Sequence, residues 1–228
     1  MIVTREYGIT TIERSSLMLT RIQVSIIVAL TMSVALLWLL LRGADPTIGS
    51  VAATFGTVVT VVYGAVLLFS LFAWPWGVFQ GWLVKRPDLR GSWKARLHSD
   101  YIDPLTGERV PPIEAFVVVR QSLTSLSMRL FTEKSRSVLT AHAIEPEPDG
   151  LFSLSAVYRN SPKIHLQGTE SSIHHGALLI EIHEVKPRRL EGHYWTDRGT
   201  RGTILLEWGT EDVYSCFEDA QRVLGQAQ

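Results

Sequence analysis

Residues 22–41 read IQVSIIVALTMSVALLWLLL, a run of twenty residues without a charged side chain, between Arg21 and Arg42. An α-helix of this length rises about 30 Å, which matches the hydrocarbon thickness of a bilayer. The flanking arginines can extend their charged groups to the lipid headgroups. The run is too long for the apolar core of a signal peptide, and it has no small-residue cleavage site. The sequence therefore predicts a membrane-spanning helix.

A second uncharged run covers residues 48–84, which is more than one span requires. We place the span at residues 48–72. Indole rings favour the interface between lipid and water. We therefore expect the residues that follow the span to lie at this interface: Trp74, Pro75, Trp76 and Trp82. The link between the two runs is short and contains Asp45-Pro46, a pair typical of turns. Residues 21–84 are therefore predicted to form an antiparallel transmembrane hairpin.

The orientation of the hairpin follows from its flanking cations. Basic residues cluster outside the two spans, at Arg5, Arg14 and Arg21 before the first and at Lys85, Arg86, Arg90, Lys94 and Arg96 after the second, whereas the connecting turn has only Arg42. Positive charge is retained on the cytoplasmic side. The tail, residues 1–20, and the domain formed by residues 85–228 are therefore predicted to be cytoplasmic. A single cysteine, Cys216, fits a reducing compartment.

Small residues recur every four positions in both spans. They are Ser25, Ala29 and Ser33 in the first, and Ala52, Gly56, Thr60 and Gly64 in the second. Stripes of this kind let two helix backbones approach closely within lipid. Two interpretations remain open: both stripes close the hairpin, or one closes it and the other joins neighbouring molecules. Because neither span carries an ionisable residue, a preformed hydrophilic channel is not expected.

The second half of the chain has the pattern of short strands separated by turns. Candidate strands are residues 89–99, 114–121, 126–132, 137–144, 152–159, 177–185, 190–196 and 203–208, and residues 210–224 have the pattern of a helix. Eight strands with short connections favour an antiparallel up-and-down barrel or a closed sandwich, with a short C-terminal helix. An eight-stranded barrel can hold one small ligand. The predicted fold is thus a membrane-anchored all-β protein.

The sequence contains no pattern typical of an enzyme. It lacks G-x-S-x-G, H-E-x-x-H, C-x-x-C and the phosphate-binding loop, and its acidic residues are scattered. The pair His174-His175 is expected in a surface loop, and no metal or other cofactor is predicted. From Leu89 to the C-terminus there are 16 lysines and arginines against 18 acidic residues. This balance argues against binding to polymeric nucleic acid, which requires a broad basic face.

A small anion requires only two or three well-placed donors. Residues 193–202, HYWTDRGTRG, supply two arginines around a turn, next to adjacent aromatic and hydroxyl side chains. The alternative is an ordinary hairpin whose arginines face water. Strand alternation adds Tyr158, which points where Phe152 and Leu154 point, and two further arginines, Arg120 and Arg129. An arginine on an apolar face requires an anionic partner; that partner is a ligand or an internal carboxylate such as Glu181 or Glu207.

A two-helix hairpin followed by a domain that opens with LRGSW at residues 89–93 is similar to a known family. The domain later carries LEGHYWTDR at residues 190–198 and GTILL at residues 202–206. From Arg21 onward the chain resembles the two-transmembrane, β-strand-rich effectors of bacterial CBASS antiphage systems. In such systems a CD-NTase senses infection and makes a cyclic nucleotide. The resemblance implies that the β-barrel binds this messenger, that the protein oligomerises, and that the inner membrane is disrupted, which kills the cell before phage mature.

With such a ligand, the residues of this chain can be given roles. We expect Arg198 and Arg201 to bind phosphates, with Arg120 and Arg129 as secondary partners. Stacking on the bases is expected from the aromatic side chains of Tyr158, Tyr194 and Trp195. The hydroxyls of Thr196 and Thr200 can bind ribose or the base edges. Expected partners are a cyclic dinucleotide, lipid and further copies of the chain. Two alternatives remain, a lipocalin-like barrel for an apolar ligand and a structural membrane anchor.

Overall fold

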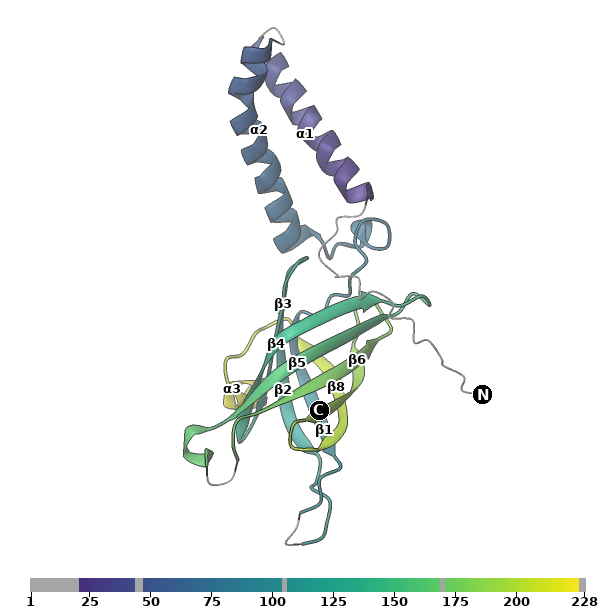
Figure 1. The fold of residues 1–228 in the computed structure, drawn as a ribbon, viewed down its shortest axis with the longest axis vertical. Coiled ribbons are helices and arrows are strands. Elements are labelled where there is room, and N and C mark those ends of the chain that lie inside the picture. The colour runs from purple at the N-terminus through teal and green to yellow at the C-terminus, as the bar shows by residue number, and fades with distance from the viewer. Residues whose placement is uncertain (1–20, 44–46, 104–105, 169–170, 226–228) are drawn as a thin grey trace, which may run out of the picture.

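The computed structural model describes residues 21–43, 47–103, 106–168 and 171–225. Two helices, α1 (Arg21–Arg42) and α2 (Ile48–Leu68), form an antiparallel pair that stands on one end of a β domain (Figure 1). A π-helical turn, η1 (Phe69–Ala73), continues α2, and a 3-10 turn, η2 (Gly77–Phe79), follows it. The predicted tail, residues 1–20, and the Asp45-Pro46 turn lie outside the described residues.

The hairpin is closed by β-branched side chains. Thr54, Val58 and Val62 recur every four residues on the face of α2 that packs on α1, and they are 4%, 2% and 8% exposed. The predicted stripes do not lie on this face: Ser25, Ala29, Ser33, Gly56 and Thr60 are exposed and Gly64 is half-buried, while the side chain of Ala52 lies outside the described residues. The described residues of the two stripes therefore do not fill the hairpin contact, which valine and threonine occupy.

The surface of the hairpin is apolar. Within the described residues, Thr54–Ala73 is long and apolar enough to cross a membrane, and a shorter apolar stretch, Val24–Trp38, lies in α1. Large apolar side chains point away from the hairpin contact; Leu40, Phe55 and Leu68 are 69%, 66% and 61% exposed.

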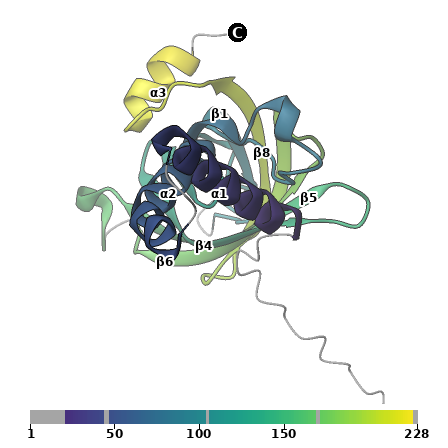
Figure 2. The same ribbon diagram turned by 90° about the horizontal axis from the view of Figure 1, so that it is seen from above.

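The β domain is a closed barrel of eight strands. Their bounds are β1 (Gly91–Ser99), β2 (Ile113–Gln121), β3 (Leu126–Thr132), β4 (Ser135–Pro146), β5 (Phe152–Pro162), β6 (His174–Ile182), β7 (Arg189–Thr196) and β8 (Arg201–Thr210). Each strand pairs antiparallel with the next, and β8 pairs with β1 to close the barrel, which lies behind the helices in the view from above in Figure 2. The predicted eight-stranded barrel is confirmed.

Alternation along each strand separates the interior from the outer wall. In β5, Phe152, Leu154 and Ala156 are buried, whereas Ser155 and Val157 on the opposite face are exposed. The barrel end next to the helices is filled, since Leu89, Trp93, Leu154, Ile182 and Leu206 are at most 1% exposed. Burying each such side chain contributes roughly 1.5–3 kcal/mol. This end of the barrel is therefore a solid core.

The outer wall of β2 and β3 is covered by the C-terminal helix, α3 (Phe217–Leu224). The rings of Phe116 and Phe217 lie 5.3 Å apart, in a second apolar cluster formed by Phe116, Val118, Phe131, Phe217, Ala220 and Leu224. The helix predicted at residues 210–224 begins only at Phe217. Its earlier part is lost because β8 continues to Thr210 and the backbone at Cys216 is still extended.

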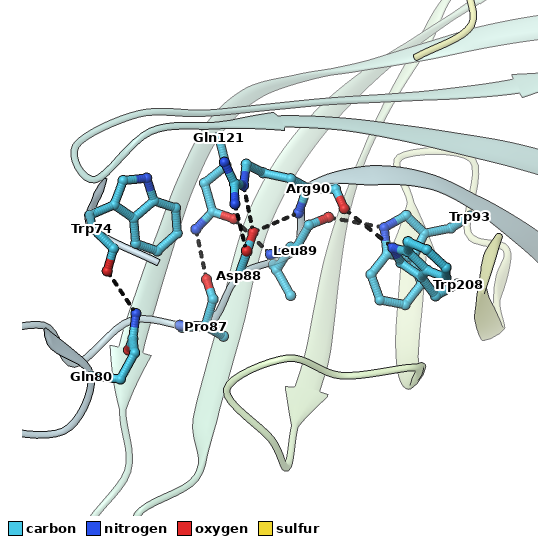
Figure 3. A network of polar contacts seen from close by, with 9 residues as sticks. All are labelled: Trp74, Gln80, Pro87, Asp88, Leu89, Arg90, Trp93, Gln121 and Trp208. Carbon is cyan, nitrogen blue, oxygen red and sulfur yellow. Dashed lines mark hydrogen bonds and ion pairs between the residues drawn. The ribbon is translucent and has the colours of Figure 1, made fainter. Parts of the chain in front are cut away.

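The segment that joins helices and barrel, residues 74–90, is held by side-chain hydrogen bonds (Figure 3). The buried Gln121 accepts a hydrogen bond from the Leu89 N–H and donates one to the Pro87 carbonyl, both at 2.8 Å. The Trp93 indole donates to the Leu89 carbonyl at 3.0 Å. These bonds fix the point at which the chain enters β1.

Two further contacts continue this junction toward the helices. Arg90 holds Asp88 through two hydrogen bonds of 2.8 Å and lies over the Trp74 ring, 5.6 Å from its centroid. The Leu123 N–H, in the turn between β2 and β3, donates to the Ser70 carbonyl of η1 at 3.0 Å. The hairpin is therefore joined to the barrel by a packed junction.

Two of the four residues predicted at the lipid interface are not exposed on the surface of the protein. Trp74 is fully buried, and Pro75 is also buried, because Trp74 packs beneath Arg90 within the junction. Trp76 and Trp82 are 59% and 54% exposed and remain available to lipid.

We expect Gln121→Leu to lower the melting temperature of the full-length protein by roughly 5–15 °C. Leucine leaves the Leu89 N–H and the Pro87 carbonyl buried without partners, and each such group costs about 1–3 kcal/mol. Thermal unfolding followed by tryptophan fluorescence measures the change. Gln167→Leu is the matched control, since Gln167 is exposed and donates one hydrogen bond to the Pro162 carbonyl. Equal melting of the two variants would contradict the role given to Gln121.

Candidate ligand-binding site

The barrel end far from the helices is hollow. A cavity of about 1750 Å³ opens there, larger than an ordinary small-molecule pocket of roughly 300–1,000 Å³. Apolar side chains from four strands line it: Val117, Met128, Leu178, Ile180 and Ile204. Polar and charged groups line the wall and the mouth, among them Glu114, Glu133, Asn160, His174 and Arg198. The cavity can therefore accept a ligand with both apolar and polar parts.

Two tyrosines lie against glycines in the cavity wall. Tyr158 of β5 is paired with Gly176 of β6, and Tyr194 of β7 with Gly202 of β8. A Cβ atom on Gly176 would lie 2.4 Å from the Tyr158 ring, and one on Gly202 would lie 2.7 Å from the Tyr194 hydroxyl. Glycine in a strand permits this close approach. Both rings are thereby held along the wall, and both line the cavity.

Burial raises the pKa of both phenols. Desolvation raises the pKa of Tyr158 to about 12, helped by the nearby Tyr194 and Asp197. Desolvation also raises the pKa of Tyr194, against a hydrogen bond from Ser99 that lowers it. At physiological pH both hydroxyls can donate hydrogen bonds, and neither repels an anion.

The Tyr158 phenol should ionise only in strong alkali. Its pKa is higher in the fold than in an unfolded chain, so the stability linked to its proton is present below about pH 10 and is lost as the pH rises toward 12. In a titration of phenolate absorbance, Tyr158→Phe is expected to remove one group from the last step. A last step that survives in Tyr158→Phe would contradict the assignment.

Asn160 is a buried amide in the cavity wall that we did not predict. Its side-chain nitrogen donates to the Ser135 and Ser137 hydroxyls at 3.0 and 2.9 Å. Asn160 follows Tyr158 by two positions in β5, so the alternation that selected Tyr158 also indicates Asn160.

His174 also lines the cavity, at the start of β6. The expected surface loop is therefore wrong for this histidine pair, which begins a strand; His174 and His175 point to opposite sides. Desolvation lowers the pKa of His174, so the imidazole is neutral at physiological pH. A neutral imidazole offers one donor and one acceptor to a ligand.

Arg198 lies at the mouth of the cavity, in the turn between β7 and β8. Its guanidinium donates to the Ser171 hydroxyl at 3.2 Å, and to the hydroxyl and carbonyl of Ser172. All of these partners are neutral, and no carboxylate of the described residues pairs with it. An anion would form stronger, charge-assisted hydrogen bonds with this group.

Residues 84–208 match the family model of the Cap15 cyclic dinucleotide receptor domain. The chain belongs to the Cap15 family. The match extends from the junction through most of β8 and so contains nearly the whole barrel. No curated protein matches the chain. Family and fold together indicate a ligand-binding effector domain and not an enzyme scaffold.

Within this Cap15 domain, the cavity brings together five of the nine nominated ligand-binding residues: Tyr158, Tyr194, Thr196, Arg198 and Thr200. The Thr196 and Thr200 hydroxyls bond to each other at 2.7 Å across the turn.

The other four nominated residues lie outside the large cavity. Trp195 and Arg201 are exposed and border a smaller depression next to Tyr194. Arg201 is paired there with Asp100 at 3.0 Å, and its backbone N–H is the main cause that lowers the pKa of this carboxyl. Arg120 and Arg129 are exposed on the outer wall, because they alternate with the interior residues of β2 and β3.

Proposed function

We propose that this protein is a membrane-anchored receptor for a cyclic dinucleotide and acts as an effector in CBASS antiphage defence. The observation that carries the proposal is a Cap15 receptor domain with a large cavity that holds two neutral tyrosines and, at its mouth, Arg198. A structural anchor requires no such cavity.

The cavity supports recognition of two bases and two phosphates. Tyr158 and Tyr194 offer aromatic faces, and stacking contributes about 1–3 kcal/mol per base. Asn160 and His174 can bind polar edges, and Arg198 can exchange its serine partners for a phosphate. Asp100 and Glu218, two carboxylates of the lining, already pair with Arg201 and Lys163. This reduces their repulsion of an anion.

The hairpin, residues 21–84, supplies the membrane part of the proposal. Its apolar surface and the stretch Thr54–Ala73 suit insertion into lipid. We propose that both α1 and α2 span the bacterial inner membrane, and that the tail and the sensing domain, residues 85–228, are cytoplasmic. The cyclic nucleotide would be supplied by an associated CD-NTase.

Activation is proposed to proceed through assembly. A ligand shifts a conformational balance only by binding one state more tightly, so the messenger must favour the assembled form. The hairpin of each copy would then pack against neighbours and disrupt the membrane, which causes abortive infection. The packed junction of Arg90, Trp74 and Gln121 supports this mechanism, since it connects barrel and helices without a flexible linker.

The direct test is calorimetric titration of the full-length protein in detergent with a panel of cyclic dinucleotides, cyclic trinucleotides and long-chain fatty acids. We expect at least one cyclic dinucleotide to bind. Binding of fatty acid with no response to any cyclic nucleotide would overturn the proposal in favour of a lipocalin-like carrier, for which the apolar cavity floor would then account.

Arg198→Gln is expected to weaken binding of that cyclic dinucleotide about tenfold or more, since a hydrogen bond to a charged group contributes about 1.5–3 kcal/mol. Arg201→Gln is the matched control, because Arg201 is exposed and already paired with Asp100. The dissociation constants from calorimetry decide between them. A larger loss with Arg201→Gln would place the phosphates at the outer depression.

A further inference from the structure

Unpaired buried polar atoms gather in the junction between helices and barrel. Among the described residues, four buried side-chain atoms lack a hydrogen-bond partner, and three of them belong to Trp74, Gln80 and Arg86. Buried polar groups are nearly always hydrogen-bonded, so such a group points to a missing partner. Two of these three atoms, the Nε1 of Trp74 and the Nε of Arg86, are donors.

Arg86 is a half-buried cation without an anion. No carboxylate of the described residues pairs with it, and the acid nearest in sequence, Asp88, is held by Arg90 through two hydrogen bonds. Burial lowers the pKa of Arg86, because its guanidinium is partly withdrawn from water.

Two basic residues lie near Arg86. Lys85 beside it is exposed. His142 of β4 lies within its field, since desolvation and then Arg86 lower the pKa of this histidine. A partly desolvated guanidinium is costly unless an anion pairs with it.

The same segment presents an apolar knob a few residues before this cation in the chain. Trp76, Val78 and Trp82 are 59%, 67% and 54% exposed. The knob has a fixed shape, because the Trp82 indole donates to the Val78 carbonyl at 2.6 Å and the rings of Trp76 and Phe79 stack at 6.3 Å. It directly follows the apolar stretch Thr54–Ala73, so a bilayer around that stretch brings its headgroups to the knob.

We propose that the junction is a phospholipid-binding site in which Arg86 binds the headgroup phosphate, Lys85 adds attraction for an anionic headgroup, and Trp76 and Trp82 contact the adjoining acyl chains. The site lies at the opposite end of the barrel from the ligand cavity. It rests on the membrane insertion proposed above. The bilayer is the favoured source of the phosphate because the knob is continuous with the apolar helices.

The test uses the full-length protein, delipidated in mild detergent and mixed with phosphatidylglycerol or diacylglycerol, which lacks the phosphate. Native mass spectrometry counts the retained lipid. We expect the wild type to retain phosphatidylglycerol and to lose diacylglycerol. Arg86→Gln should bind phosphatidylglycerol about tenfold more weakly, and Lys85→Gln, which removes only the added attraction, should lose less. Equal retention of the two lipids by the wild type would overturn the proposal even if Arg86→Gln does not fold.

Two further measurements separate the possible failures. Quenching of tryptophan fluorescence by brominated lipids in vesicles reports insertion of the same variants. If every variant is quenched and Arg86→Gln retains as much lipid as the wild type, the phosphate site alone would be overturned. If the wild type is not quenched, the membrane anchor would be overturned as well. Displacement of phosphatidylglycerol by an equal concentration of inorganic phosphate would show that a free anion is bound, and would contradict a lipid site.

Discussion

Tyr158→Leu combined with Tyr194→Leu is expected to weaken cyclic dinucleotide binding at least about 30-fold. Two bases lose their stacking partners, each stack contributes about 1–3 kcal/mol, and about 1.4 kcal/mol corresponds to a tenfold change in affinity. Leucine retains apolar volume where both tyrosines pack on the barrel core, so the barrel should still fold. Calorimetry with the full-length protein gives the dissociation constants, and thermal unfolding verifies the fold.

Trp195→Leu is the matched control for the tyrosine pair. Trp195 is an aromatic residue next to Tyr194, but its side chain is half exposed on the outer wall. Its replacement should leave the affinity unchanged. If Trp195→Leu abolished binding while the tyrosine pair had no effect, the ligand would bind outside the barrel, and the cavity would not be the receptor site.

Alternation predicts more of this site than composition does. The interior position of Tyr158 follows from Phe152 and Leu154 in the same strand, and the same reasoning indicates Asn160. It also separates Tyr194 from Trp195, because successive residues of a strand face opposite sides. The neighbouring aromatic residues therefore belong to two different surfaces, although the sequence alone suggested one stacking cluster.

The faces of β2 could not be assigned from its sequence. Val117 and Val119 point into the barrel, but Phe116 and Val118 on the opposite face are equally buried, because α3 covers them. Both faces of the strand are apolar. Because Arg120 shares a face with Phe116 and Val118, its sequence suggested that it points into the barrel, but it lies on the outer wall. Only the position of α3, about one hundred residues later in the chain, distinguishes the two faces of β2.

The junction depends on contacts that no local pattern contains. Gln121 bonds to Pro87, 34 positions earlier, and its role follows from closure of the barrel and not from the residues around it. The hairpin was similarly predicted only in part. Apolar length and the flanking arginines indicate spans, but the rotation of each helix follows from which side chains fill the contact. Valine fills it here, and the small residues are left outside.

Gly56→Leu combined with Gly64→Leu is expected to abolish killing of the host cell while cyclic dinucleotide affinity stays unchanged. A Cβ atom on either glycine meets nothing within 4 Å in its own chain, and the hairpin contact of Val58 and Val62 is untouched. Leucine is also a better helix former than glycine, by about 0.8–1.0 kcal/mol at most. The double variant should therefore keep its hairpin and lose only close packing against neighbouring copies.

Growth of cells that produce the messenger measures killing, and calorimetry measures binding. Phe55→Leu is the matched control, since Phe55 is an exposed apolar residue of α2 outside the stripe, and this variant should still kill. Loss of killing together with loss of binding would mean that the substitutions act through the barrel. Persistent killing by the double variant would exclude this stripe as the contact between copies, because leucine at both positions prevents the helix backbones from meeting there. Assembly would then have to use the small residues of α1 or the barrel itself.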